Sequence, residues 1–188
     1  MPGLWPERWI VTGGRGAGKT TFCGRVAEWA RDAGWRVAGL LSPARLERGE
    51  KIGIEALDLH SGARRLLATR GGEGGVRWGE WSFDPSTIAW GNRVLRSLAG
   101  CDLLVIDEIG PLELEKGEGW SAALPLLQEG RYRLALAVVR PEYALGQFLR
   151  WPGSCLITIP GPRETGWLAE HFSDVFLRLL GSGSERHR

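Results

Sequence analysis

Short, continuous apolar runs alternate with amphipathic stretches along most of this 188-residue chain. The runs have the length and continuity of buried strands; the first begins at Trp9, and the others cover residues 35–41, 102–106, 133–139 and 155–159. The amphipathic stretches repeat apolar positions with a helical period over residues 20–33, 86–98, 141–151 and 164–180. Strands that alternate with helices predict an α/β fold, with a mainly parallel sheet and helices on both faces.

One part of the chain does not follow this alternation. Residues 42–49 have the composition of a polar turn, residues 52–59 alternate as a half-buried strand does, and residues 64–68 return as a second strand. We therefore expect a small antiparallel β-hairpin insertion over residues 42–68. Residues 70–79 contain five glycines and no periodicity, which predicts a mobile loop.

Local signals mark the ends of several elements. Gly34 follows the first helix in the position of a C-terminal cap. Asp84 before Pro85 is the pattern of an N-cap followed by the first helical residue. A further helix is expected over residues 118–128, where Pro125 should bend it or divide it.

The most specific motif is the glycine-rich turn between the first strand and the first helix. Its residues Gly13, Gly18, Lys19 and Thr20 fit the pattern G-x-x-x-x-G-K-[ST] of a phosphate-binding loop. Glycines let backbone N–H groups wrap closely around an anion, and the following helix adds the positive end of its dipole. The predicted nucleotide-binding residues of this segment are Gly13, Gly14, Arg15, Gly16, Ala17, Gly18, Lys19, Thr20 and Thr21.

The roles within this loop follow from side-chain chemistry. Lys19 can reach the β- and γ-phosphates and is the predicted catalytic cation, and the Thr20 hydroxyl can bind Mg²⁺. Arg15 either touches phosphate or faces solvent, and the sequence does not choose between the two. The alternative for the whole segment is a glycine-rich turn with an incidental lysine. Lysine is scarce in this chain, which has only Lys19, Lys51 and Lys116, so the motif is not a product of composition.

The apolar strand over residues 102–106 is followed directly by Asp107 and Glu108. In P-loop proteins an acidic residue at the end of such a strand holds Mg²⁺ opposite the threonine of the loop, and we assign this role to Asp107. Glu108 is then placed to orient or deprotonate a water molecule in line with the γ-phosphate. Gly110 completes this side of the predicted nucleotide site. The alternative is a strand-end carboxylate that only caps the next turn.

Three segments in this order carry a resemblance to a known family: TGGRGAGKTT, VAGLLSPARLERGEKIGIEALDLHSG and DLLVIDEIGPLELEKG. They resemble the thermophilic and cancer-related nucleoside-triphosphatase family, over about residues 9–139, and the run IDEIGPLEL is more specific than a generic acidic strand end. The resemblance implies an Mg²⁺-dependent phosphatase that cleaves nucleoside 5′-triphosphates to diphosphate and phosphate. It also implies that residues 13–20 bind phosphate and that Asp107 and Glu108 have the roles given above.

Two positions depart from the pattern of this family. Leu112 stands where the family commonly has methionine, an exchange that conserves apolar volume. The family often has a histidine after the next strand, whereas this chain has Arg140, so no role of that histidine transfers. We hypothesise that Arg140 contacts the γ-phosphate in its place.

Composition limits the function classes. A net charge of +2 with scattered basic residues indicates no dedicated nucleic-acid surface. No apolar run approaches the ~20 residues of a membrane span, and no signal peptide is visible, so we expect a cytoplasmic protein. We expect a single domain over residues 1–188, with a frayed tail at residues 181–188. A monomer is compatible with the sequence, which leaves the oligomeric state open.

The remaining candidate side chains have ordinary structural interpretations. Cys23, Cys101 and Cys155 are scattered and odd in number, which indicates buried small hydrophobes rather than disulfides or a zinc site. Glu113 and Glu115 are expected on a solvated face. The tryptophans are expected to serve in packing; the alternative for Trp78 or Trp81 is to stack on a nucleotide base.

Three functions stay open at this point. They are a nucleoside triphosphatase, a nucleotide-dependent regulatory or assembly module, and a small-molecule or nucleotide kinase. A kinase needs an acceptor pocket and an arginine-bearing lid, for which Arg77 in the glycine-rich segment is the only candidate. No obvious partner surface or fused effector domain is visible, which favours the triphosphatase. Base preference cannot be read, because no guanine-specific N-K-x-D element is present.

Overall fold

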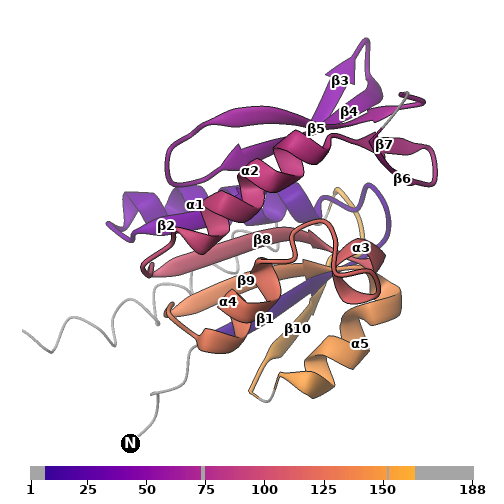
Figure 1. The fold of residues 1–188 in the computed structure, drawn as a ribbon. Coiled ribbons are helices and arrows are strands. Elements are labelled where there is room, and N and C mark those ends of the chain that lie inside the picture. The colour runs from indigo at the N-terminus through magenta and orange to yellow at the C-terminus, as the bar shows by residue number, and fades with distance from the viewer. Residues whose placement is uncertain (1–6, 73–74, 152, 164–188) are drawn as a thin grey trace, which may run out of the picture.

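The computed structural model describes residues 7–72, 75–151 and 153–163 (Figure 1). Within these ranges ten strands form one sheet in the order β10-β1-β9-β8-β2-β4-β5-β7-β6, and β3 pairs with β4. The strands are β1 (Glu7–Thr12), β2 (Val37–Leu41), β3 (Ala44–Glu47), β4 (Glu50–Asp58), β5 (Arg64–Arg70), β6 (Val76–Trp78), β7 (Trp81–Phe83), β8 (Leu103–Ile109), β9 (Leu134–Val139) and β10 (Cys155–Thr158). Neighbours from β10 to β2 are parallel, and the pairs formed by β3 to β7 are antiparallel.

Helices cover both faces of the parallel strands, which confirms the predicted fold class (Figure 1). The described helices are α1 (Lys19–Asp32), α2 (Pro85–Arg96), α3 (Pro111–Leu114), α4 (Ala123–Glu129) and α5 (Pro141–Arg150). Trp9 and Val11 of β1 share a core cluster with Phe22 of α1, whereas Ile10 belongs to the opposite cluster with Leu95 of α2. Side chains alternate across a strand, so the continuous apolar runs of this sheet serve two cores.

The insertion is larger than the sequence predicted. Residues 42–49 were expected to be a turn, but they contain β3, whose four residues are all exposed and therefore have no apolar alternation to detect. Residues 70–79 were expected to be a mobile loop, but they contain β6, which pairs with β7. The whole insertion joins the main sheet through the antiparallel pairing of β2 with β4.

Several boundaries also differ from the predictions. β8 extends to Ile109 rather than ending at residue 106, and α3 was not predicted. α4 begins at Ala123 rather than at residue 118, so Pro125 falls in its first turn, where the missing N–H has no helical acceptor and causes no break. Cys23 and Cys101 are buried as expected, but Cys155 is exposed, because it lies on the edge strand β10.

The predicted helix over residues 164–180 and the predicted tail lie outside the described residues. None of the described helices is long and apolar enough to cross a membrane.

The start of α2 is held by the predicted cap. The Asp84 carboxylate accepts hydrogen bonds from the backbone N–H and hydroxyl groups of both Ser86 and Thr87. These bonds, chiefly the side-chain bond from Ser86, lower the pKa of Asp84 from 3.8 to about 2. A carboxylate whose pKa is lower in the folded protein stabilises the folded state at pH values above its unfolded pKa, here 3.8. This stabilisation is lost as the pH falls through the pKa of the folded protein, here about 2.

We predict that Asp84→Ala lowers the free energy of unfolding by about 1 kcal/mol at neutral pH. Urea unfolding of wild type and variant measures the difference, which should shrink as the pH falls from above 3.8 toward about 2. Asp84→Asn is the control, since its side chain retains an accepting oxygen. A difference that is constant with pH would contradict the role of the carboxylate charge.

Candidate active site

The topology of the sheet brings three segments to one edge. β9 lies between β1 and β8, and all three strands are parallel, so their carboxyl ends are neighbours. The phosphate loop follows β1, Asp107 and Glu108 lie near the end of β8, and Arg140 follows β9. The Arg140 N–H donates to the carbonyl of Ile109, which fixes Arg140 beside the end of β8. In open α/β sheets this carboxyl edge is where ligands bind.

The loop from Gly13 to Thr20 has a backbone that depends on glycine. Gly13 has a φ of 145°, and a Cβ there would lie 2.3 Å from the carbonyl oxygen of Ile159. Gly16 and Gly18 also have positive φ values, of 75° and 98°. The loop therefore adopts a conformation that side chains at these positions would oppose.

Lys19 is folded back across the loop. Its ammonium donates to the carbonyl oxygens of Gly13 at 2.7 Å and Gly14 at 2.8 Å. Burial lowers the pKa of Lys19, while the charges of Glu108 and Asp107 oppose this shift. The ammonium thus binds two carbonyl groups of the loop and interacts electrostatically with both carboxylates.

Asp107 is buried, with 1% of its surface exposed, and its carboxylate contacts two other segments. One oxygen accepts from the N–H of Ser42 at 2.9 Å, and the carboxylate also accepts from the Thr20 hydroxyl. Burial, followed by the charge of Glu108, raises the pKa of Asp107 to about 6. A hydroxyl and a carboxylate in contact are hard oxygen donors that fit Mg²⁺, which takes its other ligands from water and phosphate.

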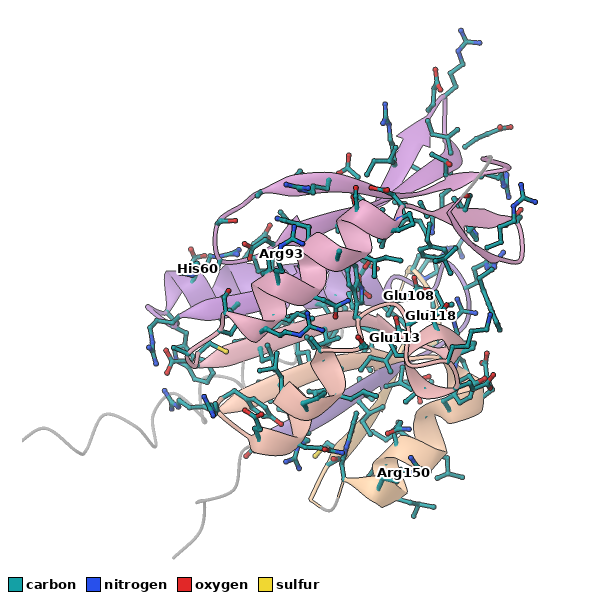
Figure 2. All side chains as sticks on the ribbon, viewed as in Figure 1. His60, Arg93, Glu108, Glu113, Glu118 and Arg150 are labelled. Carbon is teal, nitrogen blue, oxygen red and sulfur yellow. The ribbon has the colours of Figure 1, made fainter. Side chains whose placement is uncertain are left out.

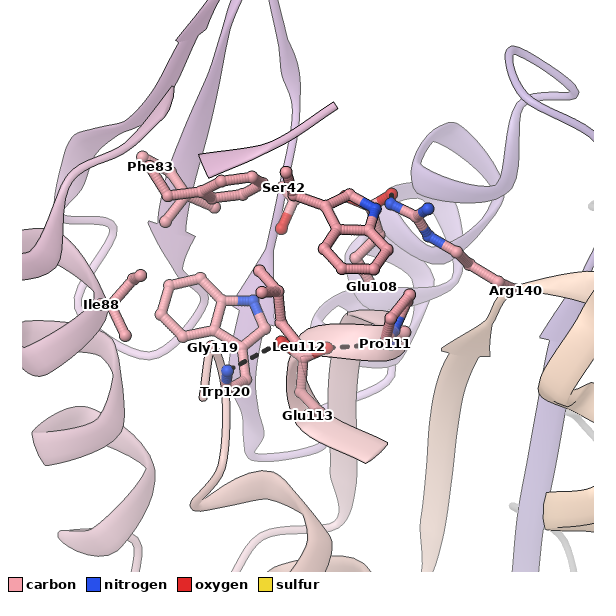
Figure 3. Close-up of a pocket in the computed structure, with 13 residues that line it drawn as sticks. Ser42, Phe83, Ile88, Glu108, Pro111, Leu112, Glu113, Gly119, Trp120 and Arg140 are labelled. Carbon is pink, nitrogen blue, oxygen red and sulfur yellow. Dashed lines mark hydrogen bonds and ion pairs between the residues drawn. The ribbon is translucent and has the colours of Figure 1, made fainter. Parts of the chain in front are cut away.

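Glu108 has the unusual backbone of this site. Its φ of 77° lies in the left-handed region, which costs a non-glycine residue on the order of 1–3 kcal/mol. Its carboxylate oxygen Oε1 lies 3.7 Å from Nη2 of Arg140, and Figure 3 shows the two side chains facing each other. Strained residues of this kind concentrate at functional sites. Glu108 is therefore a half-exposed carboxylate beside Arg140, directly after the buried Asp107.

Glu113 corrects one sequence-based expectation. It was expected on a solvated face, but it is 8% exposed and accepts from the N–H groups of Gly110 and Trp120, each at 2.9 Å (Figure 3). Burial raises the pKa of Glu113 to about 6. Glu113 and Glu108 lie at the same end of the sheet (Figure 2). The signal in the sequence was the glutamate three residues after Gly110, at the start of a helix that begins with proline.

The other predicted residues have different surroundings. Gly14, Arg15, Gly16 and Thr21 are exposed, and Ala17 is buried. Arg15 pairs with Glu80 at 3.2 Å. Gly110 lies beside Arg140, since a Cβ there would be 3.0 Å from Nε of that arginine.

Four further residues were considered in the sequence analysis. Arg77 donates to the carbonyl of Gly72. Glu115 is exposed as expected. Trp81 is buried in the core, while Trp78 is half-buried and lines a small cavity.

This cavity, which we call the Glu108 cavity, has a volume of about 30 Å³. Its apolar wall comes from the insertion, α2, α3 and the segment before α4, and Ser42, Glu108, Glu113 and Arg140 supply polar side chains. Residues 13–20 are not among its lining residues. A cavity of this size holds about two water molecules. Glu108, whose charge acts on Lys19 of the phosphate loop, therefore also lines a space of water size.

The fold and these residues define a P-loop protein of the nucleoside triphosphatase class. A family model described as NTPase matches residues 8–151. The chain therefore belongs to this nucleoside-triphosphatase family, as the sequence resemblance predicted, and its enzyme class is that of the nucleoside-triphosphate hydrolases.

Individual relatives agree with this assignment. The chain is 33% identical over 165 residues to nucleoside-triphosphatase THEP1 of Ignicoccus hospitalis, which covers 84% of this chain and 90% of that protein. It is 36% identical over 111 residues to nucleoside-triphosphatase THEP1 of Methanopyrus kandleri, with 58% and 61% of the two chains covered. The solution structure of a human cancer-related nucleoside triphosphatase superposes with a TM-score of 0.69 at 20% identity, covering 97% and 100%, and supports the fold.

We predict that Glu113→Gln lowers the free energy of unfolding by about 1–3 kcal/mol, because glutamine has one accepting oxygen for two buried N–H donors. The pKa of Glu113 is raised from 4.5 to about 6 in the folded state, so its contribution is greatest below pH 4.5 and declines as the pH rises through about 6. The difference in the free energy of unfolding between wild type and Glu113→Gln, measured by urea unfolding, should therefore be largest below pH 4.5 and decline as the pH rises through about 6.

The matched control is Glu118→Gln, because Glu118 is exposed in the same connecting segment. It should change stability by less than about 0.5 kcal/mol. Equal effects of the two variants would contradict the structural role of Glu113.

Proposed function

We propose that this protein is an Mg²⁺-dependent nucleoside triphosphatase that hydrolyses the γ-phosphate of ATP, GTP and other nucleoside triphosphates to the diphosphate and phosphate. The observation that carries the proposal is the convergence of Lys19, the Thr20–Asp107 contact and Glu108 at one sheet edge. Phosphoryl transfer depends mainly on positioning and on neutralising charge, and these are the groups required for both.

Each of these groups has a separate role in the proposed reaction. Backbone N–H groups of residues 13–20 and the N-terminus of α1 bind the phosphates, and Lys19 leaves its loop carbonyls to contact the β- and γ-oxygens. Thr20 and Asp107 would hold the ion, which when bound neutralises charge on the phosphate oxygens. Glu108 orients a water molecule and accepts its proton.

The small size of the Glu108 cavity favours hydrolysis over a kinase reaction. A kinase needs room for an acceptor molecule beside the γ-phosphate, and the cavity that Glu108 lines has a volume of about 30 Å³, which suits water better than a larger acceptor. Arg77, the one candidate for a kinase lid, is bonded to Gly72 within its own hairpin. A regulatory module that hydrolyses only with a partner remains the second candidate function, and the experiment below separates it from an enzyme with steady turnover.

We predict steady release of phosphate from ATP, GTP, CTP and UTP with Mg²⁺ and no other substrate. Chelation of the metal should abolish it, and added Mg²⁺ should restore it. Glu108→Gln should lower kcat by about 100-fold or more, because the base is lost while phosphate binding is retained. Glu118→Gln is the control. Turnover that appears only with an acceptor or a partner protein would reject the proposal.

Arg140 is the proposed γ-phosphate contact that replaces the family's histidine. Its guanidinium is half-buried next to Glu108, and its charge contributes to lowering the pKa of Lys19. A triphosphate would draw Arg140 toward the γ-phosphate and leave Glu108 free to bind water. In this interpretation the ion pair between Arg140 and Glu108 belongs to the nucleotide-free protein and breaks when a triphosphate binds.

We predict that Arg140→Ala lowers kcat by about 100-fold, with a smaller effect on the affinity for the diphosphate product, since the diphosphate lacks the γ-phosphate. Steady-state kinetics and diphosphate titration measure the two effects. Arg150→Ala is the matched control, because Arg150 is an exposed arginine on the last turn of α5, the helix that Arg140 precedes. Unchanged turnover in Arg140→Ala would remove this role.

A further inference from the structure

The proposed reaction limits the side from which a nucleophile can approach the γ-phosphate. In the proposed reaction the β-phosphate sits in the loop after β1, and the attacking oxygen and the leaving oxygen are in line across the γ-phosphorus. The nucleophile must therefore come from the side opposite the loop. Glu108 and Arg140 line the cavity and residues 13–20 do not, which is the lining expected of a space on that opposite side.

The walls of the cavity limit what can enter it. Most of the cavity wall is apolar and cannot hydrogen-bond to an entering molecule. It is formed by Leu67, Phe83, Ile88, Leu112 and the ring carbons of Trp120. The Ser42 hydroxyl already donates to the backbone oxygen of Asp107. Glu113 also lines the cavity, but each of its carboxylate oxygens already accepts a backbone N–H, so the Glu108 carboxylate is the acceptor offered to a water molecule. The cavity thus has the size for water and the polarity to direct water toward the base.

Among the large apolar side chains of the wall, Trp78 and Ile88 are only half-buried. Phe83 is buried, and Trp120 is 3% exposed and packs so closely on α2 that a Cβ at Gly91 would lie 2.3 Å from its ring. Trp78 is half-buried on the short strand β6, with Nζ of Lys116 lying 5.1 Å from its ring centre. Trp78 packs against the core cluster without being one of its buried residues, so its ring is the wall group chosen for removal to enlarge the cavity.

We propose that the Glu108 cavity is the chamber of the attacking water, and that the Trp78 ring excludes larger nucleophiles from it. Trp78 then determines that the enzyme is a hydrolase and does not transfer phosphate to alcohols. This inference rests on the proposed function, because it concerns the nucleophile of the same reaction.

The chemistry of the excluded reaction is the same as that of hydrolysis. In both, the bond from the γ-phosphorus to the bridging oxygen breaks, and the nucleoside diphosphate leaves with that electron pair. With water, the new bond forms to the water oxygen, and Glu108 receives the proton. With an alcohol, the new bond forms to the hydroxyl oxygen, Glu108 again receives the proton, and the product is a phosphate monoester.

The test uses glycerol as the competing nucleophile. Wild type and Trp78→Ala are incubated with ATP, Mg²⁺ and molar glycerol, and phosphorus NMR quantifies inorganic phosphate and glycerol phosphate. We expect wild type to release inorganic phosphate, and Trp78→Ala to raise the ratio of glycerol phosphate to inorganic phosphate by about 10- to 200-fold. A variant that hydrolyses ATP but leaves this ratio at the wild-type value would overturn the inference.

Two further variants complete the design. Trp29→Ala is the matched control, because Trp29 is also half-buried but belongs to the opposite core cluster with α1. It should leave the product ratio unchanged, and a similar rise in this control would overturn the inference. If Trp78→Ala loses ATP hydrolysis, Ile88→Ala is used instead, because it enlarges the cavity from the side of α2. The inference then requires that Ile88→Ala raise the ratio of glycerol phosphate to inorganic phosphate.

The two proposals can fail separately. Wild type that releases no phosphate from any triphosphate would reject the proposed function itself. Wild type that hydrolyses ATP while no enlarged variant transfers phosphate to glycerol would reject only the role of Trp78.

Discussion

The Asp107 carboxylate is the interaction on which the site depends. It accepts hydrogen bonds from Ser42, at the end of β2, and from Thr20, in the first turn of α1, while it belongs to β8 itself. Three segments far apart in the sequence are thus held at one point. Because the carboxylate is buried, its charge is costly unless donors or a cation surround it, and its pKa is raised to about 6. The same cost makes the site suited to a divalent ion.

The segment directly after Asp107 positions the other groups at this end of the sheet. Glu108 takes a left-handed backbone conformation, and Gly110 is held two residues later by the buried Glu113. Glu113 also holds Trp120, a wall of the Glu108 cavity. Glu108, the buried Glu113 and the cavity wall therefore form one connected unit, in which the proposed base faces a space of water size.

Much of this arrangement could be predicted from the chain alone. The phosphate loop, the two carboxylates after the apolar strand and the alternation of strands with helices are local patterns, and local patterns can be recognised without the fold. The predictions failed where local signals were weak. β3 has only exposed residues, and β6 lies in a glycine-rich segment, so both strands exist because of pairing partners rather than their own periodicity.

The sequence by itself determined which residues can bind phosphate and metal, because glycine spacing and side-chain chemistry are properties of the chain. Only the tertiary structure decided how these residues meet. The position of β9 between β1 and β8 brings Arg140 to Glu108, and the packing of α3 buries Glu113, which the sequence had placed in solvent. The physical reason is that burial and charge pairing depend on contacts between segments distant in sequence.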